Sequence, residues 1–330
     1  MSATPITPYT AAQELVRRGL GSLASHSQQT LCDDIAERLN YISLYRLFPF
    51  WAPFLQKTSR DSSTFVGGTF VPGATWDMVL GSYMFDRKLR SVIMDPISRI
   101  EIALRTQLAY HWAAASKNEY PHRNLSTYKS SFLKHGRNGD SSPQDKLWHA
   151  VEKNFQRHKI EQGDIYDDVR QARGLQDLTI RAFMEYTTLG NLECLLRAGL
   201  KHKIVKAVAQ GMGFGNVDFF VSCVSMLKDV RNACAHQSHV WNSYWRTGNS
   251  LPILRNSIPG FSEHVQEERT GAALTVCQLF LRTIAPHSRW KERLLELLNA
   301  GYIPAQQVHL ILGFSSHLWY EHPFWSTGQA

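Results

Sequence analysis

The chain has 330 residues, of which 43% are hydrophobic, so it is long enough to bury a substantial core in one large domain or in two smaller ones. Lys and Arg number 36 against 28 Asp and Glu, and the formal charge of +8 favours a polyanionic partner, because basic side chains near phosphates release condensed counterions. No basic stretch followed by an apolar run opens the chain, and no run of about 18 apolar residues follows. We therefore expect a cytoplasmic protein without membrane contact.

The longest predicted element is a helix from residue 78 to residue 115. Apolar residues recur there at steps of three and four, which is the spacing of one helix face. Three acidic residues each precede an arginine by four positions, the order that stabilises a helix: Asp86 with Arg90, Asp95 with Arg99, and Glu101 with Arg105. Pro96 lies within this element and predicts a bend.

Helical periodicity recurs along the rest of the chain, and no segment shows the alternation of a strand. The further predicted helices cover residues 11–18, 31–39, 180–198, 201–210, 217–230, 271–284 and 290–298. Glycine and proline predict loops or turns at residues 58–75, 137–143 and 248–260. The chain has no fixed repeat, so we expect an all-α fold of irregular helices rather than a solenoid or a coiled coil.

Five cysteines are scattered along the sequence, and none forms a C-x-x-C pair: Cys32, Cys194, Cys223, Cys234 and Cys277. An odd number of widely spaced cysteines argues against a disulfide framework and against a zinc site. We expect these thiols to be reduced and mostly packed, and we expect no metal site.

Positive charge gathers in two runs. The segment from Lys117 to Lys159 holds nine Lys or Arg and four His against four acidic residues, and the second run extends from Arg197 to Lys206. Each run is as compatible with a solvated helix face as with an RNA-binding surface. The candidate RNA-binding residues are Lys153, Arg157, Lys159, Lys201, Lys203 and Lys206.

One short motif carries residues suited to RNA cleavage without a metal. The chemistry needs a group that takes the proton from the ribose 2'-hydroxyl and a cation that stabilises the charged phosphorane. Histidine suits the first task, because its pKa of about 6.5 lies near neutrality. Arginine suits the second, because its guanidinium stays charged and presents a planar fork of donors. Both occur in the segment from Arg231 to His236, together with Asn232.

The Arg-x4-His spacing occurs three times, so context must choose among the three. Arg197/His202 spans a glycine in a basic run and Arg282/His287 spans a proline after a helix, which predicts surface residues in both cases. Arg231 differs, because it falls nearly in line with the apolar stripe of the helix before it. A charge in line with a core stripe is costly unless it has a partner or a task.

Geometry leaves alternatives open for this pair. On a continuous helix Arg231 and His236 stand about 140° apart, so one regular helix cannot aim both at one phosphate. Either the helix ends or kinks within the motif, or the site combines residues of two subunits across a symmetric interface. A third alternative is purely structural, with Arg231 in a buried ion pair and His236 as an interior histidine.

The sequence resembles a known family at this motif and beyond it. The run Arg231-Asn-Ala-Cys-Ala-His236, followed by Val240-Trp241-Asn242, is similar to the R-N-x-x-x-H...W-N signature of the Abi-like (abortive infection) proteins, which belong to the HEPN superfamily. Further matching blocks begin at Leu39, Phe85, Arg99, Glu185, Leu312 and Pro323. The resemblance runs from residue 9 to residue 325. Pro96, and Ser43 where glycine is expected, depart from the pattern.

The resemblance implies one elaborated HEPN-type helical bundle over residues 9–325, in which the basic segment 117–160 is a candidate insertion. It implies a metal-independent endoribonuclease without cofactors, with Arg231, Asn232 and His236 in the site, that acts as a toxin in phage defence. It also implies a homodimer and RNA partners, namely the substrate and a structured non-coding RNA. Tyr45, Arg46, Arg99, Glu101 and Arg105 are interpreted as structural.

Two other functions compete with the ribonuclease. The first is a catalytically silent HEPN-fold protein that holds a structured RNA without cutting it. The second is a nucleotide-handling enzyme or a toxin-neutralising partner on the same helical frame. The sequence has no Gly-x-x-x-x-Gly-Lys-Ser/Thr loop and no H-E-x-x-H, which argues against P-loop ATP hydrolysis and zinc hydrolysis.

Overall fold

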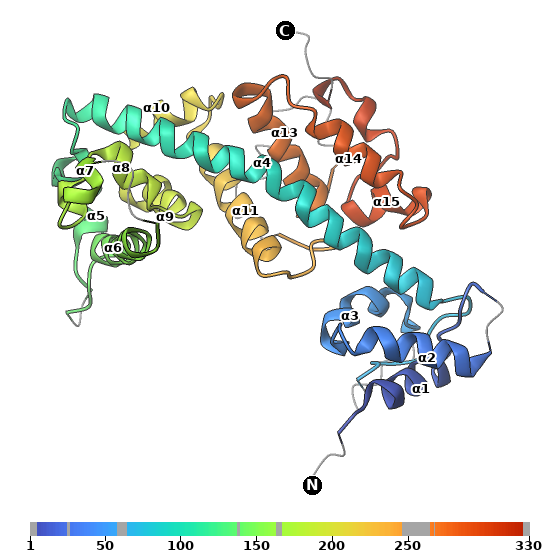
Figure 1. Ribbon diagram of the computed structural model, residues 1–330. Helices are drawn as coiled ribbons and strands as arrows, with labels where there is room; N and C mark the ends of the chain where they lie inside the picture. The colour runs from blue at the N-terminus through green and yellow to red at the C-terminus, as the bar shows by residue number, and fades with distance from the viewer. Residues whose placement is uncertain are drawn as a thin grey trace.

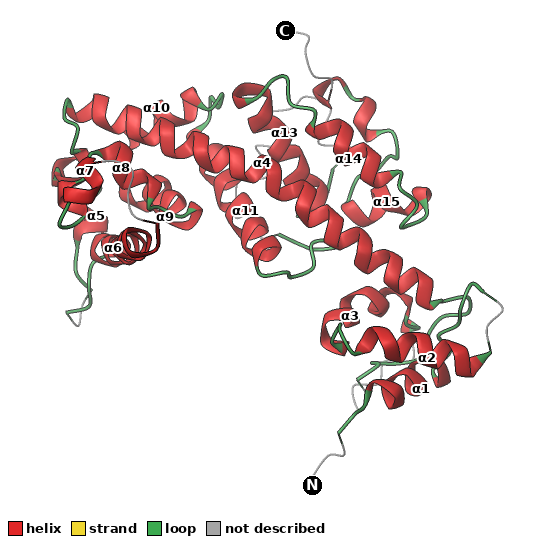
Figure 2. Cartoon of the chain, viewed as in Figure 1, coloured by secondary structure: helices red, strands yellow, loops and turns green. Residues whose placement is uncertain are grey.

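The computed structural model describes residues 5–24, 27–57, 65–136, 139–162, 167–245, 265–266 and 268–325. Helix accounts for 68% of the chain and strand for 4%, and no sheet forms among the described residues (Figure 2). The predicted all-α class is confirmed. Within the same ranges, no helix has both the length and the apolar character that crossing a membrane requires.

The helices form three groups along one long helix (Figure 1). The N-terminal group contains α1 (Pro8–Arg17), α2 (Gln28–Leu39), α3 (Leu44–Trp51) and η1 (Ala52–Phe54). The long helix is α4 (Trp76–Ser116).

The second group begins where α4 ends and returns along the chain to the middle of α4. It contains η3 (Pro121–Arg123), η4 (Leu125–Thr127), α5 (Ser130–Leu133), α6 (Pro143–Gln162), α7 (Asp167–Gln171), η5 (Leu175–Asp177), α8 (Ile180–Glu185), α9 (Leu189–Cys194), the π-helical turn η6 (Leu195–Gly199), α10 (His202–Gly211) and α11 (Val217–Ala235). The C-terminal group contains α13 (Thr270–Ile284), α14 (Trp290–Leu298), α15 (Ala305–Leu312), η8 (Trp319–Glu321) and η9 (Pro323–Trp325).

Helix α4 is the central packing element. Its first turn is capped by Thr75, whose hydroxyl accepts from the N–H of Met78 at 3.3 Å, and it ends where Lys117 adopts a left-handed conformation. At 1.5 Å per residue its 41 residues span about 60 Å. It contacts α3, α8, α10, α11, α13 and α14, so all three groups pack against it. The predicted range of 78–115 was therefore correct to within two residues.

Pro96 is buried inside α4, and the helix continues through it. A proline has no N–H, so the carbonyl of Val92, four residues earlier, loses its helical partner. The indole Nε1–H of Trp290 on α14 donates to this carbonyl at 2.8 Å. A side chain from the C-terminal group thus satisfies the backbone group that the proline leaves free.

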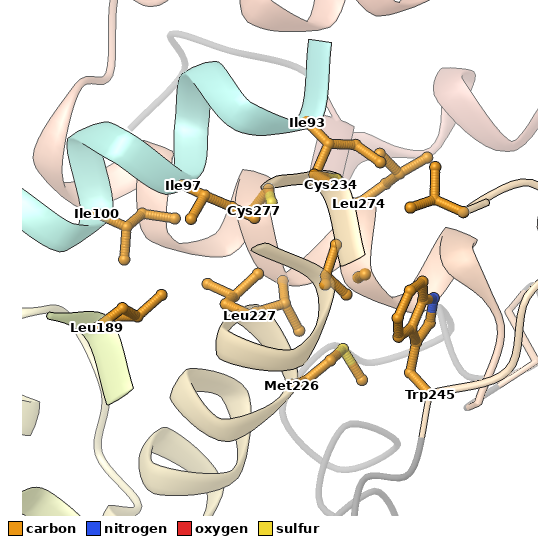
Figure 3. Close-up of a cluster of buried hydrophobic side chains, with 14 of the residues drawn as sticks. Ile93, Ile97, Ile100, Leu189, Met226, Leu227, Cys234, Trp245, Leu274 and Cys277 are labelled. Atoms are coloured by element: carbon orange, nitrogen blue, oxygen red, sulfur yellow. The ribbon is translucent and has the colours of Figure 1, made fainter. Parts of the chain in front are cut away.

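The core joins α4 to α11 and α13 (Figure 3). Ile93, Ile97 and Ile100 on α4 are fully buried, and Leu227 on α11 and Leu274 on α13 lie in the same cluster. All five cysteines are free, and every one except the half-buried Cys194 is buried, which confirms the prediction that they are mostly packed.

The structure differs from the sequence prediction between residues 180 and 198. The single helix predicted over 180–198 is wrong, because the chain breaks between Glu185 and Leu189. Thr188 forms a capping box with Asn191, and this polar cap starts a new helix. The loop predicted at 58–75 contains no helix in its described part, and the loop predicted at 137–143 runs into α6, which begins at Pro143. The turn predicted at 248–260 lies outside the described residues.

Candidate active site

The motif from Arg231 to His236 forms the end of α11. The helix is regular through Ala235, and His236 is its C-cap with φ −88° and ψ 10°. The backbone N–H of His236 still donates to the carbonyl of Asn232 at 2.9 Å, as in a helix. Because the helix ends only at the last residue of the motif, Arg231 and His236 remain about 140° apart around its axis. One chain alone does not bring the two side chains together.

The structural alternative for the pair is wrong. His236 and Asn232 are exposed, and Arg231 is half-buried rather than part of the core. The one side-chain contact of Arg231 among the described residues is to the Oδ1 atom of Asn232 at 3.5 Å, and no carboxylate pairs with it there. The other two arginines with this spacing differ, since Arg197 pairs with Glu193 at 2.5 Å and Arg282 lies over the ring of Phe324.

A tight turn follows His236 and reverses the chain. The N–H of Gln237 donates to the carbonyl of Cys234 at 3.1 Å, and the N–H of Ser238 donates to that of Ala233 at 2.8 Å. This pair of bonds is the Schellman motif, which places the residue after the cap in the left-handed region. Gln237 has a φ of 58°, although glycine is the residue that this position favours. The turn directs the chain after His236 back against α4.

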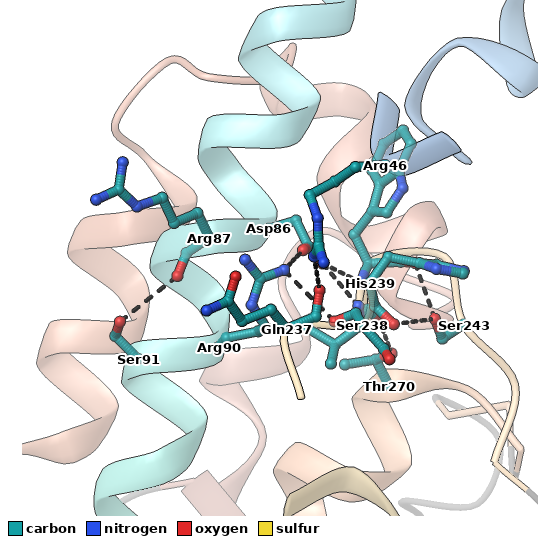
Figure 4. A network of polar contacts seen from close by, with 12 residues as sticks. Arg46, Asp86, Arg87, Arg90, Ser91, Gln237, Ser238, His239, Ser243 and Thr270 are labelled. Atoms are coloured by element: carbon teal, nitrogen blue, oxygen red, sulfur yellow. Dashed lines mark hydrogen bonds and ion pairs between the residues drawn. The ribbon is translucent and has the colours of Figure 1, made fainter. Parts of the chain in front are cut away.

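Asp86 of α4 fixes this returning segment (Figure 4). Its carboxylate is fully buried and accepts from the backbone N–H groups of Val240 at 2.7 Å and Trp241 at 2.8 Å. It also forms an ion pair with Arg90. Burial raises the pKa of Asp86, while the two backbone hydrogen bonds and the charge of Arg90 act to lower it. Asp86 and Arg90 therefore do more than the i to i+4 helix pairing that the sequence predicted for them.

The C-terminal group holds the other side of the same segment. Thr270 donates through its hydroxyl to the carbonyl of Val240 at 2.5 Å, and Arg269 bonds the side chain of Asn242. Asn242 has a φ of 47°, which asparagine tolerates better than most residues. On the N-terminal side the ring of Phe50 stacks on Trp241 with a centroid distance of 5.7 Å. The W-N part of the family-like signature is thus a packing element.

A hollow opens beside His236, between α3, α4 and the returning segment. Its volume is about 270 Å³. Its walls carry two arginines, two histidines and two tyrosines, and no acidic residue lines it. We call it the arginine hollow and define it by its lining residues: Ser43, Tyr45, Arg46, Pro49, Phe50, Tyr83, Arg90, His236, Gln237, Ser238 and His239.

Both arginines of the hollow hold the returning segment. Arg46 of α3 donates to the carbonyl of Gln237, and Arg90 donates to the carbonyl of Ser238 at 3.4 Å (Figure 4). Ser43, the departure from the family-like pattern, caps α3 by accepting from the N–H of Arg46 at 3.3 Å. Arg46 therefore has the structural role that the sequence predicted, whereas Tyr45 is 93% exposed and packs little.

The candidate RNA-binding lysines lie elsewhere. Lys201, Lys203 and Lys206 are exposed at the N-cap and on the surface of α10. Lys153 and Arg157 are exposed on α6, and the side chain of Lys159 lies outside the described residues. In the view of Figure 1, α10 and α6 lie on opposite sides of α8 and α9. These basic residues thus lie on separate elements, and none of them lines the arginine hollow.

Sequence reasoning found the motif but missed the buried carboxylate beside it. Asp86 follows the same logic that singled out Arg231, because it stands in line with the buried stripe formed by Leu89, Ile93 and Ile97. That signal was present in the sequence. No comparable signal in the sequence places Arg46 and Tyr45 in the hollow beside His236. Their proximity to His236 depends on contacts between residues about 190 positions apart.

Comparison with protein families gives one match. The model of the family described as Abi-like protein matches residues 37–242, which is more than half of the chain. Neither the curated proteins nor the solved structures contain a match. The matched segment includes every residue that lines the arginine hollow.

Proposed function

The chain belongs to the Abi-like protein family, whose description points to abortive infection, and from this premise we propose that it is a metal-independent endoribonuclease. In this proposal it acts as a toxin in the cytoplasm during phage defence. The observation that carries the proposal is the exposure of His236 on the wall of a hollow that holds two arginines and no carboxylate. Such a site attracts a phosphodiester and offers it a group that can transfer a proton.

The proposed reaction assigns one task to each residue of the motif. The imidazole of His236 takes the proton from the ribose 2'-hydroxyl, and the resulting oxygen attacks the adjacent phosphorus. The guanidinium of Arg231 stabilises the charged phosphorane, and Asn232 orients the groups around it. The bond from phosphorus to the 5'-oxygen of the next nucleotide breaks, this oxygen takes a proton from water, and a 2',3'-cyclic phosphate remains.

Two copies of the chain are needed for this assignment. Because α11 is regular through the motif, the Arg231 and His236 of one chain face different directions. A two-fold axis beside the two motifs brings Arg231 of the partner subunit toward His236, and the half-buried Arg231 has no carboxylate partner among the described residues that would compete. We therefore propose a homodimer with composite sites.

In addition to the RNA substrate, we propose a second RNA partner. The charge of +8 and the exposed lysines of α10 and basic residues of α6 suit a structured non-coding RNA that binds away from the motif and controls the toxin. If the site proves inactive, the same surfaces support the alternative, a catalytically silent RNA-binding protein.

Single substitutions in the motif test the proposed reaction. His236→Ala and Arg231→Ala should each abolish cellular toxicity and reduce RNA cleavage by about a hundredfold to ten-thousandfold, the usual effect of losing a positioned acid or base. RNA binding should stay largely intact. Cleavage by the wild-type protein should survive EDTA and leave a cyclic phosphate at the product end.

Arg282→Ala is the matched control, because Arg282 has the same spacing to a histidine but lies over Phe324. It should cut RNA at the wild-type rate. Melting temperatures must show that both motif variants are folded. If the folded variants cut RNA like the wild type, the site assignment fails and the RNA-holding alternative replaces it.

A further inference from the structure

We propose that the arginine hollow binds one unpaired nucleotide of the RNA substrate, with its phosphate at Arg46 and Arg90 and its base stacked on Tyr45. This inference rests on the proposed function and names the part of the substrate that the site recognises. None of the residues Tyr45, Arg46 and Arg90 belongs to the Arg-x4-His motif. The hollow is therefore a binding site in addition to the proposed catalytic residues.

The charge of the hollow selects an anion. Its lining contains two guanidinium groups and two imidazoles and no Asp or Glu. Arg90 is held by the buried Asp86, which neutralises one of the two guanidinium charges. Arg46 is exposed, and among the described residues no carboxylate pairs with it. One uncompensated arginine in an acid-free hollow favours a phosphate over a neutral ligand.

The two guanidinium groups are also positioned for a phosphate. Each arginine uses its Nη1 atom for the carbonyl of Gln237 or Ser238, so both are fixed against the same short segment. A guanidinium has five N–H donors in a fixed plane, and these contacts leave donors on each side chain for a further acceptor. Fixing the side chains in advance lowers the conformational entropy that binding would otherwise cost.

Tyr45 supplies the surface for a base. Its side chain is 93% exposed at the wall of the hollow, although a tyrosine usually buries much of its ring. Phe50 and Tyr83 form the apolar floor, with their rings edge to face at 5.5 Å. An exposed ring beside fixed cations is the arrangement by which proteins hold single strands, because bases stack on the ring while the phosphates meet the charges.

The size and the chemistry of the hollow favour one nucleotide of a single strand, which is RNA under the proposed function. A volume of about 270 Å³ is slightly below the range of roughly 300–1,000 Å³ for sites of whole small molecules, which suits one nucleotide of a longer chain. A base in a duplex is stacked on its neighbours and cannot lie on Tyr45. His236 and His239 line the same hollow, so a nucleotide held there lies next to the proposed catalytic imidazole.

Binding of a short, uridine-rich, fluorescein-labelled RNA, followed by anisotropy, tests the inference. All variants carry His236→Ala, so that no RNA is cut. Tyr45→Ala should weaken binding of the single strand by about fivefold to 150-fold, the measured range for the loss of one stacked base, and Tyr45→Phe should restore it. The matched control is Tyr41→Ala, since Tyr41 is 87% exposed in the same group of helices but does not line the hollow.

Salt dependence tests the phosphate contact separately. Arg46→Gln should reduce the slope of log affinity against log salt by about one, whereas Arg46→Lys should keep it. Arg38→Gln removes the same charge from an exposed position on α2 and should leave the slope unchanged. The same RNA annealed to its complement should bind more weakly than the single strand and should not respond to Tyr45→Ala.

The inference is overturned if Tyr45→Ala and Tyr41→Ala weaken binding equally, or if the duplex binds as tightly as the single strand. The proposed function fails in a different way, through unchanged cleavage by the folded His236→Ala variant. The two failures are therefore measured on different variants and with different readouts.

Discussion

His122 is a fully buried imidazole between the second group of helices and the end of α4. Its ring stacks on Phe183 at 4.7 Å, and its Nε2–H donates to the carbonyl of Leu175 at 3.2 Å. The Nδ1 atom has no partner among the described residues. Burial lowers the pKa of His122 to about 4. The side chain is therefore neutral at pH 7.

This burial predicts a loss of stability in mild acid. The pKa of His122 in the folded chain is below its value of 6.5 in the unfolded chain, so the unfolded state binds a proton first. The free energy of unfolding is unaffected by the titration of His122 above pH 6.5. It falls by about 3 kcal/mol as the pH drops from 6.5 to about 4.

Denaturant unfolding at a series of pH values measures this effect. His122→Phe should flatten the pH dependence in that window by about 3 kcal/mol, although it leaves the carbonyl of Leu175 without its donor and lowers stability at pH 7. His149→Phe, at an exposed histidine of α6, should follow the wild-type curve. Parallel curves for His122→Phe and the wild type would contradict the assignment.

At the scale of single residues, the sequence predicted the members of the motif but not their surroundings. Arg231, Asn232 and His236 were found from their chemistry and their spacing along one helix. The hollow beside His236 depends on the turn at Gln237, which adopts a left-handed conformation without being glycine. Nothing in the local sequence predicts that conformation, since the contacts from Arg46 and Asp86 that hold the segment come from distant parts of the chain.

At the scale of elements, the contact between α14 and α4 predicts a coupling between Trp290 and Pro96. Trp290→Phe leaves the half-buried carbonyl of Val92 without a donor, which should cost about 1 kcal/mol or more in addition to the loss of packing. In the Pro96→Ala background, the new N–H of residue 96 can bond the same carbonyl. The loss of packing is similar in both backgrounds, so it cancels in a double-mutant cycle.

The expected interaction energy between the two substitutions is about 1 kcal/mol or more, measured by chemical denaturation of the four proteins. Additive effects of the two substitutions would show that the indole does not replace the missing helical donor.

Element prediction worked where one face of a helix is buried along its whole length. The buried stripe of α4 is a local signal, so the predicted bounds were close to those of the structure. The break between α8 and α9 was missed, because residues 180–198 keep an apolar stripe across Thr188. The helix is interrupted there over only three residues. A short polar cap is easily outweighed by the periodicity on both sides of it.

At the scale of the whole molecule, the proposed composite sites predict complementation between two inactive chains. In a dimer of Arg231→Ala with His236→Ala, one site lacks both groups and the other keeps both. Random assortment of equal amounts gives half mixed dimers, each with one of two sites intact, so the mixture should recover about a quarter of the wild-type cleavage rate. Cleavage by each variant alone is the control.

Coexpression followed by purification through two different affinity tags would isolate the mixed species. Sites built within single chains would give no recovery in that species, because each chain would then lack one essential group.

The bond between Trp290 and Val92 also has a consequence for the order in which the protein is made. The two residues are 198 positions apart, and synthesis proceeds at roughly 5–20 residues per second. The carbonyl of Val92 is therefore made about 10–40 seconds before the indole that bonds it. Ile93 and Ile97 pack against α11 and α13, so they stay exposed on the nascent chain until those later helices have been made, and protease accessibility of arrested chains should show it. The segment after His236, which lines the arginine hollow, bonds Asp86 through Val240, 154 positions later, so the hollow also forms well after the part of α4 that carries one of its walls.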